Sequence, residues 1–87
     1  MYSVVTHANI HDREAATKAL QEQIVPRASQ APGFVAGYWN AVGPDKGVSV
    51  VVFESEDQAR AAADQLQPPG DFVSFDSVEV AEVVAHA

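Results

Sequence analysis

Residues 33–54, GFVAGYWNAVGPDKGVSVVVFE, contain two strand-like runs separated by a short turn. The runs 33–40 and 47–54 are rich in the β-branched and aromatic residues that favour strands. The segment between them, 43–47, combines two glycines with Pro44 and Asp45, which is typical of a turn. We therefore predict a β-hairpin over these residues.

A helix is predicted to begin at Ser55, directly after the hairpin. Ser55 and Gln58 have the spacing of a capping box, in which two side chains bond the free N–H groups of the first turn. An apolar stripe follows at helical spacing: Ala59, Ala62, Ala63 and Leu66. The Gln67-Pro68-Pro69-Gly70 segment should end this helix.

The hairpin and helix are preceded by a second strand–helix pair. Residues 2–8 form an expected strand, with His7 on one face and Thr6 on the other. The helix after it should begin near residues 10–12, with Asp12 or Asn9 as its N-cap. Pro26 should kink or end this helix near Val25, because proline lacks the N–H of the helical bond, with a last turn through Ala28 as the alternative.

A last strand is expected over about residues 72–84, with simple alternation along its length. Phe72, Ser74, Asp76, Val78 and Val80 would then share one face, opposite Val73, Phe75, Ser77 and Glu79.

The complete order β-α-β-β-α-β predicts an α+β, ferredoxin-like fold over a single domain, residues 1–87. Right-handed crossovers place both helices on one face of a four-stranded antiparallel sheet. The other face would be bare and apolar, which a monomer rarely exposes. We therefore expect a homodimer that brings two bare faces together.

Composition excludes several classes of protein. The net charge is −7, and the five basic residues are scattered, so no nucleic-acid partner is expected. No apolar run approaches the ~20 residues of a membrane span, and no export signal is evident, so we expect a cytoplasmic protein without a membrane partner. Cysteine is absent, which removes thiolate chemistry. His7, His11 and Asp12 straddle a strand–loop junction, a poor arrangement for metal binding, so no metal is expected.

Several of these segments resemble the dimeric α/β-barrel superfamily. The Ala31-Pro32-Gly33-Phe34 turn, the Gly37-Tyr38-Trp39 run and the junction of Val50–Ser55 with an alanine-rich helix are similar to small proteins related to antibiotic-biosynthesis monooxygenases. The resemblance covers nearly the whole chain in element order. It implies a dimeric barrel with a pocket between sheet and helices, in a superfamily that also includes isomerases, peroxidase-like enzymes and haem-degrading enzymes.

Haem degradation is not expected from this resemblance. The haem-degrading members have an Asn on the first strand, a Trp on the third and a His on the second helix. Here Phe53 stands near the expected Trp, and residues 55–66 contain no histidine.

The resemblance implies a cofactor-independent monooxygenase- or isomerase-like enzyme for a small aromatic or polyketide-like molecule, with no cofactor required. We assign candidate catalytic roles to His7 and Asn40, as polar contacts to a substrate oxygen. Tyr38, Trp39 and His11 are the candidate substrate-binding residues. The alternative is a non-catalytic dimer that binds a ligand or partner, in which these side chains pack, end strands or lie in solvent.

Overall fold

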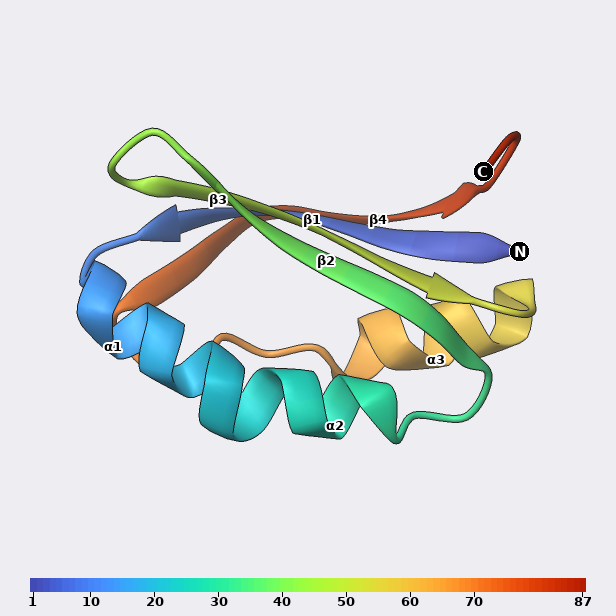
Figure 1. The fold of residues 1–87 in the computed structure, drawn as a ribbon, viewed down its shortest axis with the longest axis horizontal. Helices are drawn as coiled ribbons and strands as arrows, with labels where there is room; N and C mark the ends of the chain where they lie inside the picture. Colours follow the sequence, from blue (N-terminus) through green and yellow to red (C-terminus); the bar gives the residue numbers. More distant parts are fainter.

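A computed structural model describes residues 1–87. Its elements, in chain order, are β1 (Tyr2–Ile10), α1 (Arg13–Ala19), η1 (Leu20–Ile24), α2 (Val25–Ser29), β2 (Phe34–Val42), β3 (Lys46–Phe53), α3 (Glu56–Gln65) and β4 (Val73–Glu82). The strands form one antiparallel sheet in the order β2-β3-β1-β4. Both helical segments lie on the same side of this sheet, which leaves the other side uncovered (Figure 1). The predicted ferredoxin-like fold is confirmed.

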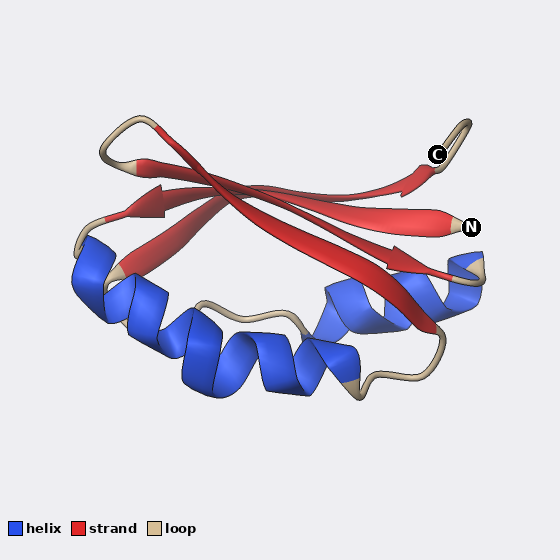
Figure 2. Ribbon diagram, viewed as in Figure 1, coloured by secondary structure: helices blue, strands red, loops and turns tan.

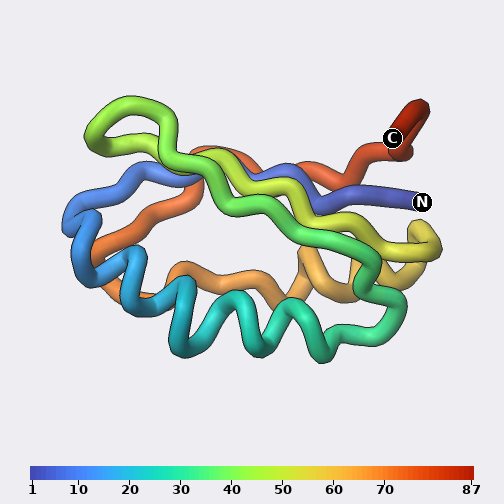
Figure 3. The backbone as a smooth tube through the Cα atoms, viewed as in Figure 1, coloured from blue at the N-terminus to red at the C-terminus, as the bar shows by residue number.

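The first helical segment runs through α1, η1 and α2 without a break (Figure 3). Asp12 caps it, because its Oδ1 accepts a hydrogen bond from the Ala15 N–H at 3.1 Å. The helix does not end near Val25: α2 continues to Ser29, in agreement with the alternative of a last turn through Ala28. The wider π turn η1 immediately precedes Pro26, and such a turn accommodates a residue that cannot make the regular helical bond.

The cap of α3 is one half of the predicted capping box. Ser55 Oγ accepts a hydrogen bond from the Gln58 N–H at 3.2 Å. The reciprocal bond is absent, since Gln58 Oε1 is buried without a hydrogen-bond partner. The Gln58 side chain instead packs against Gly33, whose φ of 79° suits glycine and where a Cβ would collide with the Gln58 amide.

The strand register divides the side chains between two faces, which we call the helix face and the open face. On the helix face, Thr6 of β1 lies opposite Ser49 of β3, and Ser49 lies opposite Trp39 of β2. The open face contains the alternate positions, including Val5, His7, Tyr38 and Val50. Figure 2 shows the helices against only one of these faces.

The simple alternation predicted for β4 is wrong, because a bulge interrupts it. His7 pairs with Ser77 but the next residue, Ala8, pairs with Phe75, so Asp76 is an extra residue. A bulge of this kind changes which residues share a face. Phe75 and Val78, predicted on opposite faces, therefore both lie on the helix face.

Ala16 and Ala19 are buried on α1, but the main hydrophobic cluster lies at one end of the space between sheet and helices. Val4, Phe53 and Ala59 are its buried residues, and the rings of Phe34 and Phe53 meet edge to face with centroids 6.5 Å apart. This core lies under α3. The space under α1 and η1 is less completely filled, and this is where the candidate site lies. No helix in the structure is long and apolar enough to cross a membrane.

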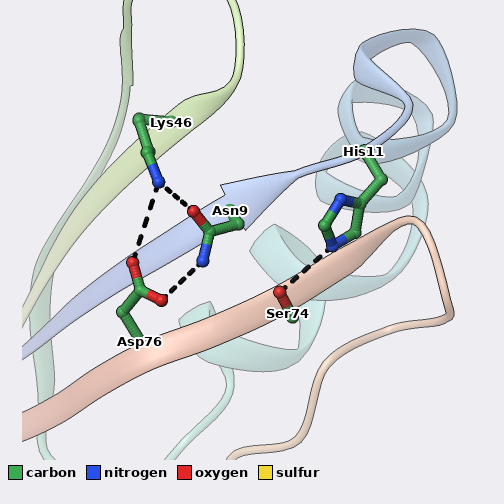
Figure 4. Close-up of polar contacts among 5 residues, drawn as sticks. All are labelled: Asn9, His11, Lys46, Ser74 and Asp76. Atoms are coloured by element: carbon green, nitrogen blue, oxygen red, sulfur yellow. Dashed lines mark hydrogen bonds and ion pairs between the residues drawn. The ribbon is translucent and has the colours of Figure 1, made fainter.

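The open face combines an apolar centre with a polar end. Val5, Val48, Val50 and Val52 are half-buried there, beside a Tyr38 that is 64% exposed. At the end near the hairpin turn, Lys46 donates to Asn9 Oδ1, and Asn9 Nδ2 donates to Asp76 (Figure 4). Lys46 Nζ also lies 4.0 Å from the Asp76 carboxylate. Three strands therefore contribute to one polar cluster.

Candidate functional site

A cavity of about 320 Å³ lies between the helix face of the sheet and the first helical segment. Eleven of its 19 lining residues are hydrophobic, and the loop after α3 closes one side. The lining residues are Thr6, Ala8, Ile10, Arg13, Ala16, Thr17, Leu20, Ile24, Trp39, Asn40, Ala41, Gly47, Val48, Ser49, Leu66, Gln67, Pro69, Val73 and Phe75. This volume lies at the lower end of the range of small-molecule pockets, which is roughly 300–1,000 Å³.

The floor of the cavity presents two hydroxyl groups beside an indole ring. Thr6, Ser49 and Trp39 form a row across three neighbouring strands on the helix face. Thr6 is only 4% exposed, and neither its hydroxyl nor that of Ser49 makes a side-chain hydrogen bond within the protein. Such groups can bond an oxygen atom of a ligand that displaces water from the cavity.

The mouth of the cavity contains its only charged residue, Arg13. Arg13 and Thr17 are four residues apart on α1 and so lie on the same face of the helix. Arg13 Nη1 donates a hydrogen bond to the Gly43 carbonyl at 3.3 Å. Its guanidinium is in neither of the two ion pairs, Lys46–Asp76 and Arg60–Glu56.

The structure brings together two of the five candidate residues. Trp39 and Asn40 both border the cavity, although the strand register places Asn40, opposite Val48, on the open face. The Asn40 side chain is exposed, and its Nδ2 donates to the Val48 carbonyl at 3.0 Å. The indole of Trp39 therefore lies where an aromatic ligand could stack on it.

The other three candidate residues lie outside the cavity. His7 and Tyr38 are exposed on the open face. His11 is exposed beyond the end of β1, where its Nε2 lies 3.1 Å from Ser74 Oγ (Figure 4). None of the three is among the residues that line the cavity. Their catalytic and binding roles remain predictions.

Thr6, Ser49 and Arg13 are the functional candidates that the sequence did not single out. A signal existed for Thr6, which shares the face of Val4 and Ala8 in an otherwise apolar alternation. Ser49 similarly interrupts the valine run 48–52. Arg13 gave no comparable signal, because an arginine in the first turn of a helix is ordinarily solvated.

The cavity contains no ordinary acid or base. Its lining includes no His, Asp, Glu, Cys, Lys or Tyr. No cluster of three metal-ligating side chains occurs in the structure. The pKa of Arg60 is raised, first by its hydrogen bond to Glu56 and then by the charge of that carboxylate, but this pair lies on α3 outside the cavity. Any proton transfer from a bound molecule must therefore use the ligand itself or water.

A family model described as "G patch domain-containing protein, N-terminal" matches residues 8–86. No curated protein sequence matches the chain.

Three solved structures from Mycobacterium tuberculosis share the fold. The haem degrader MhuD with two haems in its active site is 21% identical, with a TM-score of 0.56 over 97% of this chain and 98% of that one. A mutant of MhuD with two manganese protoporphyrin IX molecules bound per active site is also 21% identical, with a TM-score of 0.56 over 97% of both chains. A haem-free form of the same haem-degrading protein is 23% identical, with a TM-score of 0.54 over 99% and 96% of the two chains. The predicted resemblance to antibiotic-biosynthesis-monooxygenase-like proteins is confirmed as a likeness of fold.

Proposed function

The chain belongs to the family described as "G patch domain-containing protein, N-terminal", and we propose that it binds a small, flat aromatic molecule in the cavity beside Trp39. The main support is the row of Thr6, Ser49 and Trp39 on the cavity floor. An indole ring offers a stacking surface, and two unpaired hydroxyls offer hydrogen bonds to a ligand oxygen. An apolar pocket with a few polar groups of this kind is typical of small-molecule sites.

For the reaction, we propose a cofactor-independent oxygenation of the bound molecule. A phenol or its anion would be oxidised by O₂ to a quinone: one oxygen atom enters the ring, the other leaves as water, and the substrate supplies all the electrons. The lining contains no general base. The substrate would therefore react as an anion formed in solution, with its ionised oxygen at the rim beside Arg13 and not at the uncharged floor.

A non-catalytic binding protein is the second candidate, and the same absence of acid and base groups favours it. The two candidates differ in oxygen consumption. A catalytic protein would consume O₂ in the presence of its bound ligand, with a rate that rises as the phenol ionises. A binding protein would hold the ligand and leave the O₂ concentration unchanged.

The residues of the cavity do not fit haem. Haem iron is held by His, Cys, Met or Tyr side chains, and the cavity lining has none of these. The pattern of the haem-degrading members is also missing: Phe53 is buried in the core under α3, and α3 contains no histidine. Asn9, on the first strand, points to the open face, where it bonds Asp76. The proposed function therefore does not involve haem, although one of the similar solved structures holds two haems and another holds two manganese protoporphyrin IX molecules.

We also propose that the protein is a homodimer in which the open faces of two copies pack together. Support comes from the half-buried valines of β1 and β3 and from the exposed Tyr38 and Val42, which would otherwise form an apolar patch in water. Such patches commonly mark association sites, and a two-fold axis would pair each patch with itself.

A thermal-shift screen tests ligand binding. Hydroquinones, naphthols and polycyclic phenols are suitable probes, with Trp39→Ala as the test variant and Tyr38→Ala as its matched control on the opposite face. A ligand at ~100 times its dissociation constant adds about 2.7 kcal/mol to the free energy of unfolding, and each kcal/mol raises the midpoint by roughly 4–8 °C. We expect a shift that Tyr38→Ala retains and Trp39→Ala loses. No shift with any probe, or an equal shift in both variants, would contradict the proposal.

A further inference from the structure

We infer that the ligand of this cavity is bipolar, with a neutral hydrogen-bonding oxygen at the floor and a carboxylate-type anion at the mouth. This inference rests on the proposed function, because it assigns a chemical class to the molecule proposed to bind beside Trp39. Two separate sets of residues support it, one at each end of the same cavity.

The floor favours a neutral group. Thr6 is 4% exposed and Ser49 is half-buried, and no charged side chain lies in this row across the sheet. A charge placed there would lose its hydration without gaining an opposite charge. A phenolic hydroxyl or a carbonyl needs only the bonds that two hydroxyl groups can supply.

The mouth favours an anion. Arg13 is the only charged lining residue and is exposed, so its guanidinium can meet a ligand carboxylate without a large desolvation cost. Asp12 and Glu14 are its acidic neighbours in sequence, but Arg13 forms an ion pair with neither. Asp12 is instead engaged as the helix cap. Apart from the bond of Nη1 to the Gly43 carbonyl, the Arg13 guanidinium therefore has donors left for an anion despite the net charge of −7.

Thr17 adds a second polar group at the mouth of the cavity. Its side chain lies one helical turn beyond Arg13 and also lines the cavity. A carboxylate has two oxygen atoms, and a guanidinium together with a neighbouring hydroxyl can donate to both. Between the two polar ends, the wall is apolar, with Leu20, Ile24 and Phe75 among its residues. A two-ring aromatic body with an oxygen at each end matches this order of groups.

The test uses 6-hydroxy-2-naphthoate, its methyl ester and 2-naphthoate as probes at pH 7, where a carboxylate is ionised. The protein has one Trp, so 5-fluorotryptophan labelling gives a single ¹⁹F signal that reports occupancy of the cavity. The acid should bind about fivefold more tightly than the ester, since the anion meets an exposed guanidinium.

Two sets of variants test the mouth and the floor of the cavity separately. Arg13→Gln should abolish the preference for the acid over the ester, whereas Arg13→Lys, which keeps the charge, should retain part of it. The double variant Thr6→Val with Ser49→Ala should weaken 6-hydroxy-2-naphthoate about tenfold and leave 2-naphthoate unchanged. Comparing probes within each variant cancels any general effect on folding.

The outcomes distinguish this inference from the function on which it rests. Binding of the ester as tightly as the acid, or an acid preference that survives Arg13→Gln, would overturn the anionic mouth. Equal losses for both naphthoates in the floor variant would overturn the neutral floor. If no probe moved the ¹⁹F signal even at saturating concentration, the proposed aromatic ligand itself would be wrong.

Discussion

Phe53 and Tyr38 lie on the adjacent strands β3 and β2, yet Phe53 is 2% exposed under α3 while Tyr38 is 64% exposed on the open face. The two faces of the sheet contain similar apolar residues, because the valine run 48–52 contributes to both. Only the helix face has a covering layer within the chain. Residue type alone therefore does not decide what stabilises this monomer. An apolar side chain contributes its full burial energy only where another part of the chain covers it.

The same contrast extends to polar groups. The helix face has two hydroxyls, of Thr6 and Ser49, in a half-enclosed cavity and without partners in the protein. On the open face, Asn9, Lys46 and Asp76 satisfy one another in an exposed cluster. Polar groups that are already hydrogen-bonded gain little from a bond to a ligand. This difference places the candidate ligand site on the helix face and the candidate association surface on the open face.

The largest expected effect separates the two aromatic residues. Phe53→Ala should lower the free energy of unfolding by about 3–5 kcal/mol, because it leaves a cavity in the core. Tyr38→Ala, measured under conditions where the protein is monomeric, should change it by less than about 1 kcal/mol. Urea titration followed by circular dichroism measures both. A Phe53→Ala protein as stable as Tyr38→Ala would abolish the distinction between the faces.

A charge at the centre of the open face should break the proposed dimer. Val50→Lys would bury two like charges between the copies, at a cost of about 3 kcal/mol or more in association. Light scattering should then report a particle of 9.3 kDa, with the circular dichroism spectrum unchanged. Val84→Lys is the control, since Val84 is 91% exposed in the C-terminal segment. A wild-type protein that is already 9.3 kDa at micromolar concentration would show that the open face is not a self-association surface.

A smaller effect concerns the layer that covers Phe53. Ser55→Ala removes the hydroxyl that accepts the Gln58 N–H, and should lower the free energy of unfolding by about 1 kcal/mol. Ser55→Asp, which keeps an acceptor at the N-cap, should restore most of the loss. Hydrogen exchange of the backbone amides shows which helix is destabilised, and we expect faster exchange in α3. Faster exchange confined to α1 and α2 would contradict a role for Ser55 in holding α3 over the core.

Most of the fold could be predicted from sequence because its signals are local. Asp12 and Ser55 fixed the starts of two helices, and the hairpin turn set the pairing of β2 with β3. At Pro26 the sequence left two alternatives open, an end near Val25 or a last turn through Ala28. A π turn before the proline lets the helix continue, and no pattern in the sequence marks such a turn.

The candidate site was harder to predict, because it depends on which face each strand turns toward the helices. Trp39 and Tyr38 are neighbours of similar type, and the strand pairing alone decides that Trp39 borders the cavity while Tyr38 does not. His7 was a reasonable candidate by chemistry, but the same register places it on the open face. Arg13 became a candidate only when the fold placed α1 along the cavity.

The extra residue Asp76 in β4 affects which insertions and deletions this sequence can tolerate during evolution. On one side of Asp76, Val73 and Phe75 line the cavity, and on the other side Val80 packs against the core under α3. Loss of the Asp76 codon would restore strict alternation and leave both groups on the helix face, because Phe75 and Val78 would then be two residues apart. The ligand wall and the folding core are thus joined through one bulge. The strand can therefore lose a residue at the bulge, whereas loss of a paired residue such as Glu79 would turn one of the two groups toward the open face.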